Sequence, residues 1–203
     1  MADPFSATAA LTVAFDIKSP ECYLALAPTR SLARELDLDV DWLPLVTSPP
    51  RRAPAGDDRG ARHKRHRVAY RAMDLARYAR VQGLTIRELD RTPDSTLAGM
   101  AMLAARAHSD AALHEFLDRA FERYWKVELD LENATAIRAI LTEVGVAEFD
   151  PDREAFATLE ASLAAAGLFN APAYLVEDEV FQGRGHLPMI RWILTGRTGP
   201  GPI

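Results

Sequence analysis

Two stretches near the start of the chain alternate between apolar and polar positions, and each alternation predicts a β-strand. Residues 11–17 place Leu, Val, Phe and Ile at the odd positions, and residues 38–42 place Leu, Val and Trp at the even ones. The second strand is expected to end at Pro44, because proline has no N–H group to donate to a neighbouring strand. The first fifty residues therefore contain two short strands.

A helix is predicted between these two strands. Ser19 is a preferred N-cap residue and Pro20 is a preferred first helical residue, so the helix should begin here. Pro28 inside the helix predicts a kink. The side chains expected on its inner face are those of Leu24, Ala27, Leu32 and Leu36. Together these elements form a βαβ unit, whose strands are parallel and whose crossover is right-handed.

The next hundred residues carry apolar side chains at helical spacing and predict no strand. After a loop that includes Pro54, Gly56 and Gly60, a helical stripe runs toward Gly83, where the helix should end. The apolar members of this stripe are Val68, Ala72, Leu75, Ala76 and Ala79. Further helices are predicted over residues 113–125, 133–144 and 150–167.

Strand patterns return only near the C-terminus. Residues 173–176 and 180–181 flank an acidic turn and predict a hairpin, and a last helix follows over residues 187–194. If both ends of the chain share one sheet, the fold is α/β: a βαβ unit, an all-helical insertion and a ββα unit. The chain is then divided into a first half, a helical insertion and a second half, at residues 1–50, 51–166 and 167–203.

The composition is that of an ordinary globular chain with one core. Its 203 residues are 48% hydrophobic and 26% charged, which argues against disorder and against a coiled coil. The net charge of −5 gives no reason to expect nucleic acid or an anionic membrane as a partner. The chain shows neither a signal-peptide pattern nor an apolar run of about 20 residues. We expect a cytoplasmic protein whose partner is a small-molecule substrate.

One segment departs from the acidic average. Residues 51–71 hold eight Lys or Arg against two Asp, a local charge of +6, so the remainder carries −11. We expect this basic stretch to face the acidic remainder, a ligand carboxylate or solvent, because it has no interleaved aromatic residues of a nucleic-acid module. His63 and His66 within it have a ligand-like spacing, but the arginines around them would repel a metal cation. We predict no metal site.

The single cysteine, Cys22, limits the chemistry that the chain can perform. One thiol forms no intramolecular disulfide, no cysteine zinc cluster and no two-cysteine redox pair. A lone cysteine is most often a small buried hydrophobic residue, and we favour this interpretation over a reactive thiol or a glutathionylation site.

The strongest candidate site surrounds Ser19, which follows a strand and begins a helix. Unpaired amides and the helix dipole at such a position stabilise an anion, a thiolate included. The simpler interpretation is that Ser19 is only an N-cap worth about 1 kcal/mol. Far along the chain, Pro172 stands at the mouth of a strand, which predicts a special backbone conformation such as a cis peptide bond. In a sheet shared by both halves, Pro172 could face Ser19.

Several segments, taken in order, point to one family. Residues 15–24 read Phe-Asp-Ile-Lys-Ser-Pro-Glu-Cys-Tyr-Leu, and residues 167–172 read Gly-Leu-Phe-Asn-Ala-Pro. With the segments 70–84, 121–130 and 181–188, they resemble the thioredoxin-fold group that contains DsbA-like proteins, kappa-class glutathione transferases and 2-hydroxychromene-2-carboxylate isomerases. The resemblance covers most of the chain and implies a thioredoxin-like fold.

The resemblance also implies a glutathione site. In the isomerases and kappa-class transferases, the serine at the position of Ser19 donates a hydrogen bond to the glutathione thiolate, so Ser19 is the catalytic candidate. The backbone before the cis-proline pairs with the cysteinyl backbone of glutathione, which implies binding roles for Ala171 and Pro172.

The chain departs from the family pattern in the turn after the hairpin. Where the enzymes carry Gly-x-Asp-Arg-Leu, residues 183–187 read Gly-Arg-Gly-His-Leu, so the acidic partner for the γ-glutamyl ammonium group is missing from the turn. We expect Arg184 and His186 to receive a ligand carboxylate instead, or to be a surface cation and a helix-start residue.

These observations support one leading hypothesis and two others. The leading hypothesis is a glutathione-dependent isomerase-like or transferase-like enzyme that acts on a small aromatic or electrophilic substrate. The alternative is a non-catalytic thioredoxin-fold protein that binds a ligand or a partner. A thiol-disulfide oxidoreductase is disfavoured, because a serine cannot form the mixed disulfide. The resemblance also implies a homodimer.

Overall fold

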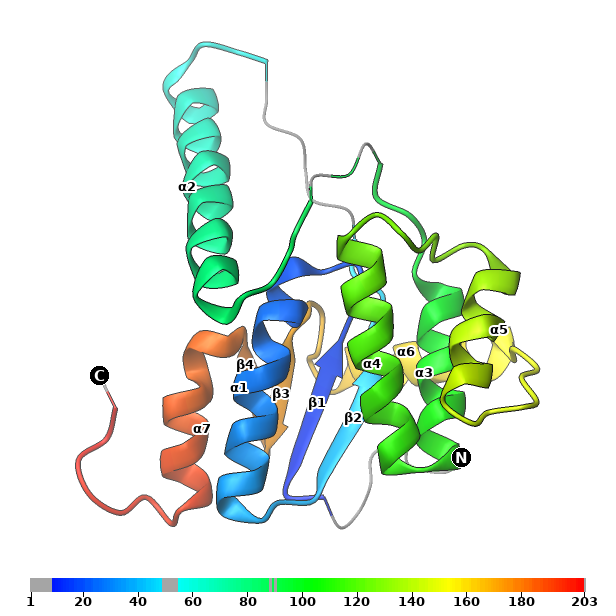
Figure 1. Ribbon diagram of the computed structural model, residues 1–203. Coiled ribbons are helices and arrows are strands. Elements are labelled where there is room, and N and C mark those ends of the chain that lie inside the picture. Colours follow the sequence, from blue (N-terminus) through cyan, green and yellow to red (C-terminus); the bar gives the residue numbers. More distant parts are fainter. Residues whose placement is uncertain (1–8, 49–54, 88, 90, 203) are drawn as a thin grey trace.

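The computed structural model describes residues 9–48, 55–87, 89 and 91–202. Its sheet has four strands in the order β2-β1-β3-β4 (Figure 1). Their bounds are Leu11–Phe15 for β1, Val40–Pro44 for β2, Ala173–Val176 for β3 and Glu179–Gln182 for β4. The β1–β2 pair is parallel, and β1–β3 and β3–β4 are antiparallel. The expectation that both ends of the chain share one sheet is therefore confirmed.

Seven α-helices and one short 3₁₀ helix accompany the sheet in the described part of the chain. They are α1 (Pro20–Leu36), α2 (Arg59–Gln82), α3 (Thr96–His108), α4 (Asp110–Trp125), α5 (Ala134–Glu143), α6 (Arg153–Ala165), η1 (Arg184–His186) and α7 (Leu187–Leu194). Helices α1 and α7 lie side by side against the sheet, and α3, α4 and α5 gather beyond β2 (Figure 1). This order of elements is the predicted α/β, thioredoxin-like arrangement with helices between its two halves.

Helix α1 packs most tightly in its first two turns. Residues 22–26 are all buried, and Tyr23 stacks on Phe121 of α4 with ring centroids 5.2 Å apart. The prediction that Ala27 faces inward is wrong: the buried face of the helix continues through Thr29 and Leu32, and Ala27 lies on the opposite side and is exposed. The helix continues as one element through Pro28.

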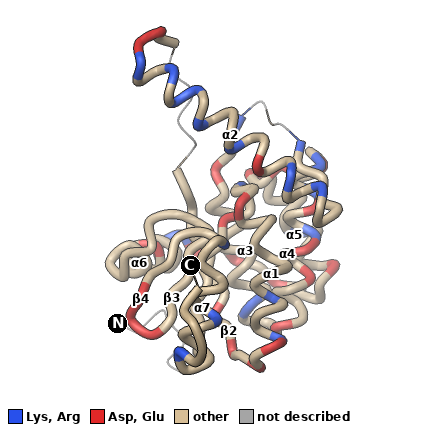
Figure 2. Tube along the Cα trace, turned by 90° about the vertical axis from the view of Figure 1, so that its left-hand side faces the viewer, with Lys and Arg blue, Asp and Glu red and all other residues tan. Residues whose placement is uncertain are grey.

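Helix α2 begins earlier than predicted, and most of its apolar stripe lies outside the core. It begins at Arg59 after an N-cap at Asp58, so Gly60 lies in its first turn rather than in a loop. Only Ala61 and Ala79 of this helix are buried, and Val68 is 48% exposed. Figures 1 and 2 show α2 standing away from the body of the protein, with Lys and Arg along its projecting half. Its apolar stripe therefore does not join the core.

Helix α3 has no individual counterpart in the sequence prediction. Residues 98–102 are all buried, and the helix packs against β2 and α4. A continuous apolar run carries no 3.6-residue alternation, so its helical character does not stand out in the sequence. No helix in the described part of the chain is long and apolar enough to span a membrane.

We expect Gly99→Ala in α3 to destabilise the protein by about 1–3 kcal/mol, because a methyl group does not fit there. A Cβ atom at this position would lie 2.8 Å from Cζ of Phe156 and 3.2 Å from Cβ of Pro44. Chemical denaturation measures the change in the free energy of unfolding. Gly185→Ala is the matched control, since nothing lies within 4 Å of its Cβ position. Equal stabilities of the two variants would contradict the prediction.

Candidate functional site

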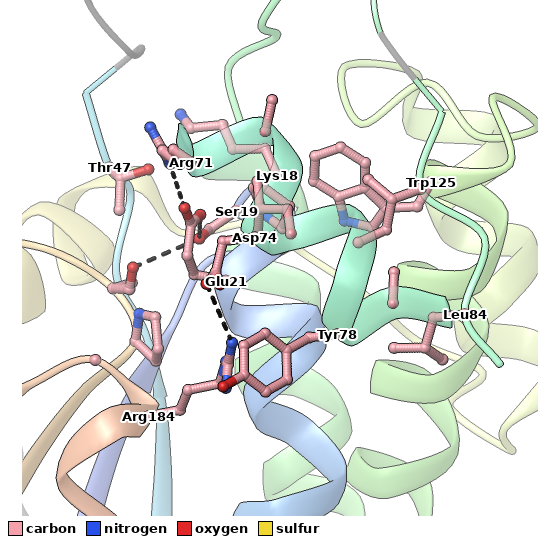
Figure 3. Close-up of a pocket in the computed structure, with 18 of the residues that line it drawn as sticks. Lys18, Ser19, Glu21, Thr47, Arg71, Asp74, Tyr78, Leu84, Trp125 and Arg184 are labelled. Atoms are coloured by element: carbon pink, nitrogen blue, oxygen red, sulfur yellow. Dashed lines mark hydrogen bonds and ion pairs between the residues drawn. The ribbon is translucent and has the colours of Figure 1, made fainter. Parts of the chain in front are cut away.

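The site is built around the hydroxyl group of Ser19, at the N-cap of α1. Ser19 Oγ accepts a hydrogen bond from the Cys22 N–H group at 3.3 Å, as an N-cap residue does. The same oxygen lies 3.3 Å from Oε2 of Glu21 and 3.4 Å from the carbonyl oxygen of Ala171, both acceptors (Figure 3). Ser19 is therefore an N-cap and also the meeting point of α1 with the second half of the fold.

The segment that reaches Ser19 from the second half contains a cis peptide bond between Ala171 and Pro172, which is one form of the special conformation expected for Pro172. Gly183 holds this segment by donating its N–H to the Pro172 carbonyl oxygen at 2.8 Å. The Ala171 carbonyl is thus placed beside the Ser19 hydroxyl although the two residues are 152 positions apart. The predicted encounter of Ser19 and Pro172 at one edge of the sheet is observed.

The loop between β1 and α1 is held in place from several sides. Asp16 accepts hydrogen bonds from the N–H and the hydroxyl of Thr47, both at 2.7 Å. Trp125 donates its indole N–H to the Ile17 carbonyl oxygen at 3.2 Å. Lys18 is buried, and its Nζ lies 3.8 Å from Oδ2 of Asp16. These contacts tie the loop that carries Ser19 to the loop after β2 and to the end of α4.

Ser19 opens onto a cleft of about 1460 Å³. Its walls come from the start of α1, the loop after β2, one face of α2 and the segment that follows it, the end of α4, and the segments before β3 and after β4. The apolar side chains on the walls include Val68, Leu75, Leu84, Ile86, Leu89 and Trp125. The apolar stripe of α2 thus lines a cleft, which explains its exposure.

Arg184, one of the two predicted carboxylate receptors, lines this cleft and already has partners. Its guanidinium carbon lies 3.7 Å from the centre of the Tyr78 ring, a cation–π contact. One of its nitrogens lies 4.0 Å from Oδ2 of Asp74 (Figure 3). The other carboxylate oxygen of Asp74, Oδ1, accepts a hydrogen bond from Arg77 at 2.8 Å. Asp74 on α2 therefore brings a carboxylate to the turn whose sequence lacks one.

His186, the other predicted receptor, lies outside the cleft. Its ring is exposed and packs against Phe181 with centroids 5.7 Å apart, and it is not among the described residues that line the cavity. The turn of η1 directs Arg184 and His186 to different sides, so the structure brings only Arg184 to the site of Ser19.

Sequence reasoning did not assign roles to two further side chains of the cleft. Arg71 donates a hydrogen bond to Glu21, next to Ser19, and Tyr78 carries the Arg184 cation. Arg71, Asp74 and Tyr78 recur three and four positions apart, a spacing that places them on one face of a helix. That spacing was the available signal, but it does not say which surface the face meets.

The thiol of Cys22 is fully buried, as the preferred interpretation of the lone cysteine required. Its sulfur accepts a hydrogen bond from the Asp16 N–H at 3.3 Å. Burial raises the pKa of the thiol well above its usual value, since a thiolate would be desolvated there. His63 and His66 are exposed on α2, and no three metal-ligating side chains gather anywhere in the described residues.

We expect Cys22 to resist alkylation in the folded protein, because reaction needs an accessible thiolate. Incubation with iodoacetamide followed by intact-mass measurement should show an unmodified native chain. The same treatment in denaturant should add one label per chain, which serves as the control. Stoichiometric labelling of the native protein at neutral pH would show that the thiol is accessible and contradict the prediction.

Comparison with known proteins agrees with this architecture. A family model described as the DSBA-like thioredoxin domain matches residues 10–194. A 2-hydroxychromene-2-carboxylate isomerase structure has a TM-score of 0.62 at 18% identity and covers 92% of this chain and 94% of its own. The cytosolic disulfide reductase DsbM from Pseudomonas aeruginosa, solved with GSH, has a TM-score of 0.61 at 21% identity. The match covers 92% of this chain and 98% of the DsbM chain. Sequence identities this low, together with these TM-scores, show a shared fold and nothing further. No curated protein matched the sequence.

Proposed function

Because the chain belongs to the DSBA-like thioredoxin domain family, we propose that it is a glutathione-dependent enzyme of the isomerase-like or transferase-like kind. It would act on a small aromatic or electrophilic substrate in the cleft beside α2. One observation carries the proposal: the Ser19 hydroxyl and the Ala171 carbonyl, at the cis-proline, lie 3.4 Å apart and line one cleft.

The proposed chemistry is the activation of a thiol that arrives with the ligand. The sulfur of glutathione would take the Ser19 hydrogen bond at the positive end of α1, where an anion is stabilised. The thiolate is the nucleophile, so lowering the pKa of the thiol from about 8.5 increases the reactive fraction at neutral pH. The Ala171 backbone would bind the cysteinyl backbone of the same ligand.

The cleft offers one acidic and one basic side chain to the γ-glutamyl end of glutathione. The γ-glutamyl end of glutathione carries an ammonium group and a carboxylate, and Asp74 and Arg184 lie together on the cleft wall. Asp74 would accept the ammonium group, and Arg184 would hold the carboxylate by charge-assisted hydrogen bonds. A carboxylate from α2 thus replaces the one that the turn of residues 183–187 lacks.

A thiol-disulfide oxidoreductase is not proposed, although one similar structure is a disulfide reductase. Ser19 cannot form a mixed disulfide, and Cys22 is fully buried behind it. The proposal includes a cytoplasmic location, where glutathione is the main thiol. It also includes a homodimer, to which the exposed apolar residues of α2, Tyr70, Met73 and Val81, would contribute.

Calorimetry with reduced glutathione at millimolar concentration tests the proposal, followed by turnover with a panel of aromatic electrophiles. We expect saturable binding and thiol-dependent turnover. Binding without turnover of any electrophile would favour the non-catalytic binding protein, and no binding would refute the glutathione-dependent function. Asp74→Asn should weaken binding of glutathione, while Asp57→Asn, on an exposed carboxylate of the projecting end, should not.

A further inference from the structure

The Ser19 hydroxyl has two hydrogen-bond acceptors but only one proton. Its neighbours are Oε2 of Glu21 at 3.3 Å and the carbonyl of Ala171 at 3.4 Å, and neither can donate to it. To donate to a bound thiolate, the hydroxyl must give up these acceptors. Glu21 is the charged one of the two, so it competes with the thiolate for the same proton.

Glu21 is itself bound on its other oxygen. Oε1 accepts a hydrogen bond from Nε of Arg71 on α2, across the mouth of the cleft (Figure 3). The Glu21 side chain is 28% exposed and that of Arg71 is 52% exposed, so the pair lies at the boundary between cleft and solvent. The hydrogen bond to Glu21 raises the pKa of the Arg71 guanidinium, which therefore keeps its charge. Both members of the pair line the cleft with Ser19.

The other charged groups around Ser19 have partners other than the Ser19 hydroxyl. Lys18 and Asp16, in the loop before α1, face each other, and Asp16 is hydrogen-bonded to the loop after β2. On α2 and η1, Asp74 faces Arg77 and Arg184. Glu21 is therefore the carboxylate in direct contact with the Ser19 hydroxyl.

A sulfur that accepts a hydrogen bond from the Ser19 hydroxyl would lie near the Glu21 carboxylate, within the ~4–6 Å over which one negative charge disfavours another. The buried thiol of Cys22 shows the same sign of effect: burial is the main cause of its raised pKa, and the charges of Asp16 and Glu21 add to it. Arg71 opposes this repulsion, because it neutralises the Glu21 carboxylate through direct contact.

We propose that Glu21 and Arg71 are positioning residues that set the acidity of the thiol held at Ser19, Glu21 disfavouring the thiolate and Arg71 offsetting Glu21. This inference rests on the proposed glutathione-dependent function. In the structure Glu21 accepts a hydrogen bond from the Ser19 hydroxyl. When glutathione binds, its S–H proton leaves to solvent, the Ser19 hydrogen turns to the sulfur, and Glu21 keeps only its bond to Arg71.

The test is the pH titration of glutathione bound to the full chain, followed by the ultraviolet absorbance of the thiolate. We expect Glu21→Gln to lower the pKa of the bound thiol by about one unit and Arg71→Ala to raise it by about one unit. The double variant should return close to the wild-type value, because neither charge remains. Arg71→Lys should bring the pKa of the bound thiol most of the way back to the wild-type value, since lysine keeps the positive charge.

Arg67→Ala is the matched control, because it removes the same charge from an exposed position on the same helix. It should leave the titration unchanged. If glutathione binds and all variants titrate with the wild-type pKa, the role of Glu21 and Arg71 is refuted while the proposed function stands. If wild-type protein binds no glutathione, both proposals are refuted.

Discussion

Replacing Arg106 by alanine should lower the free energy of unfolding by about 3 kcal/mol, because it breaks the ion pair between Arg106 and the buried carboxylate of Asp41. Asp41 is on β2 with a fully buried side chain, and Arg106 reaches it from α3. This ion pair joins β2 of the sheet to α3 of the helical layer. Chemical denaturation measures the loss.

Two further variants separate this explanation from a general loss of packing. Asp41→Asn combined with Arg106→Ala should be more stable than Arg106→Ala alone, because the amide carries no charge to desolvate. Arg197→Ala removes an arginine whose ion pair with Glu177 is exposed on both sides, so it should change stability little. A stability of Arg106→Ala within about 0.5 kcal/mol of wild type would contradict the prediction, since that is the range of a surface substitution.

The local signals predicted most of the elements because they act over a few residues. The alternation at residues 11–17 and the Ser19-Pro20 start of α1 need nothing from the rest of the chain to be recognised. Helix α3 gave no such signal, because residues 98–102 are buried on every side and have no polar positions to set a period. Its close contact between Gly99 and Phe156 exists only in the folded structure.

The direction in which an element faces proved harder to predict than its type. The stripe of α2 has the period of a helix that packs on a core, yet Val68 and Ala72 line an open cleft. Ala27 of α1 is exposed because it lies on the side of the helix opposite to the buried Thr29 and Leu32. A hydrophobic pattern shows that a face is apolar, whereas the elements around the helix decide whether that face is buried.

The candidate site also has one part that the sequence predicts and one part that it does not. Ser19 and Pro172 end up together because each lies at the mouth of a strand in one shared sheet, a relation that topology alone predicts. The contacts of Arg184 with Asp74 and Tyr78 depend on how α2 lies over the turn of η1, which no local pattern contains. In the structure Arg184, the expected carboxylate receptor, faces a carboxylate of the protein itself.

We expect Ser19→Ala to reduce glutathione-dependent turnover by about 10²–10³-fold, the effect of removing one donor that stabilises a developing anion. Turnover should fall because a smaller fraction of the bound thiol is ionised, so the pH at which turnover is half-maximal should rise. Binding of glutathione should weaken less, because the Ala171 backbone, Asp74 and Arg184 remain in the cleft. Turnover and calorimetry on the same preparation separate the two effects.

The N-cap role of Ser19 has to be separated from its chemistry, because the substitution also removes the bond to the Cys22 N–H. Ser109 is the matched control: it caps α4 by accepting a hydrogen bond from Ala112 at 3.1 Å and is not among the described residues that line the cleft. Each alanine variant should lose about 1 kcal/mol of stability. Only Ser19→Ala should lose turnover. If both variants retain it, Ser19 is an N-cap alone, and the thiolate must be stabilised by another donor of the cleft.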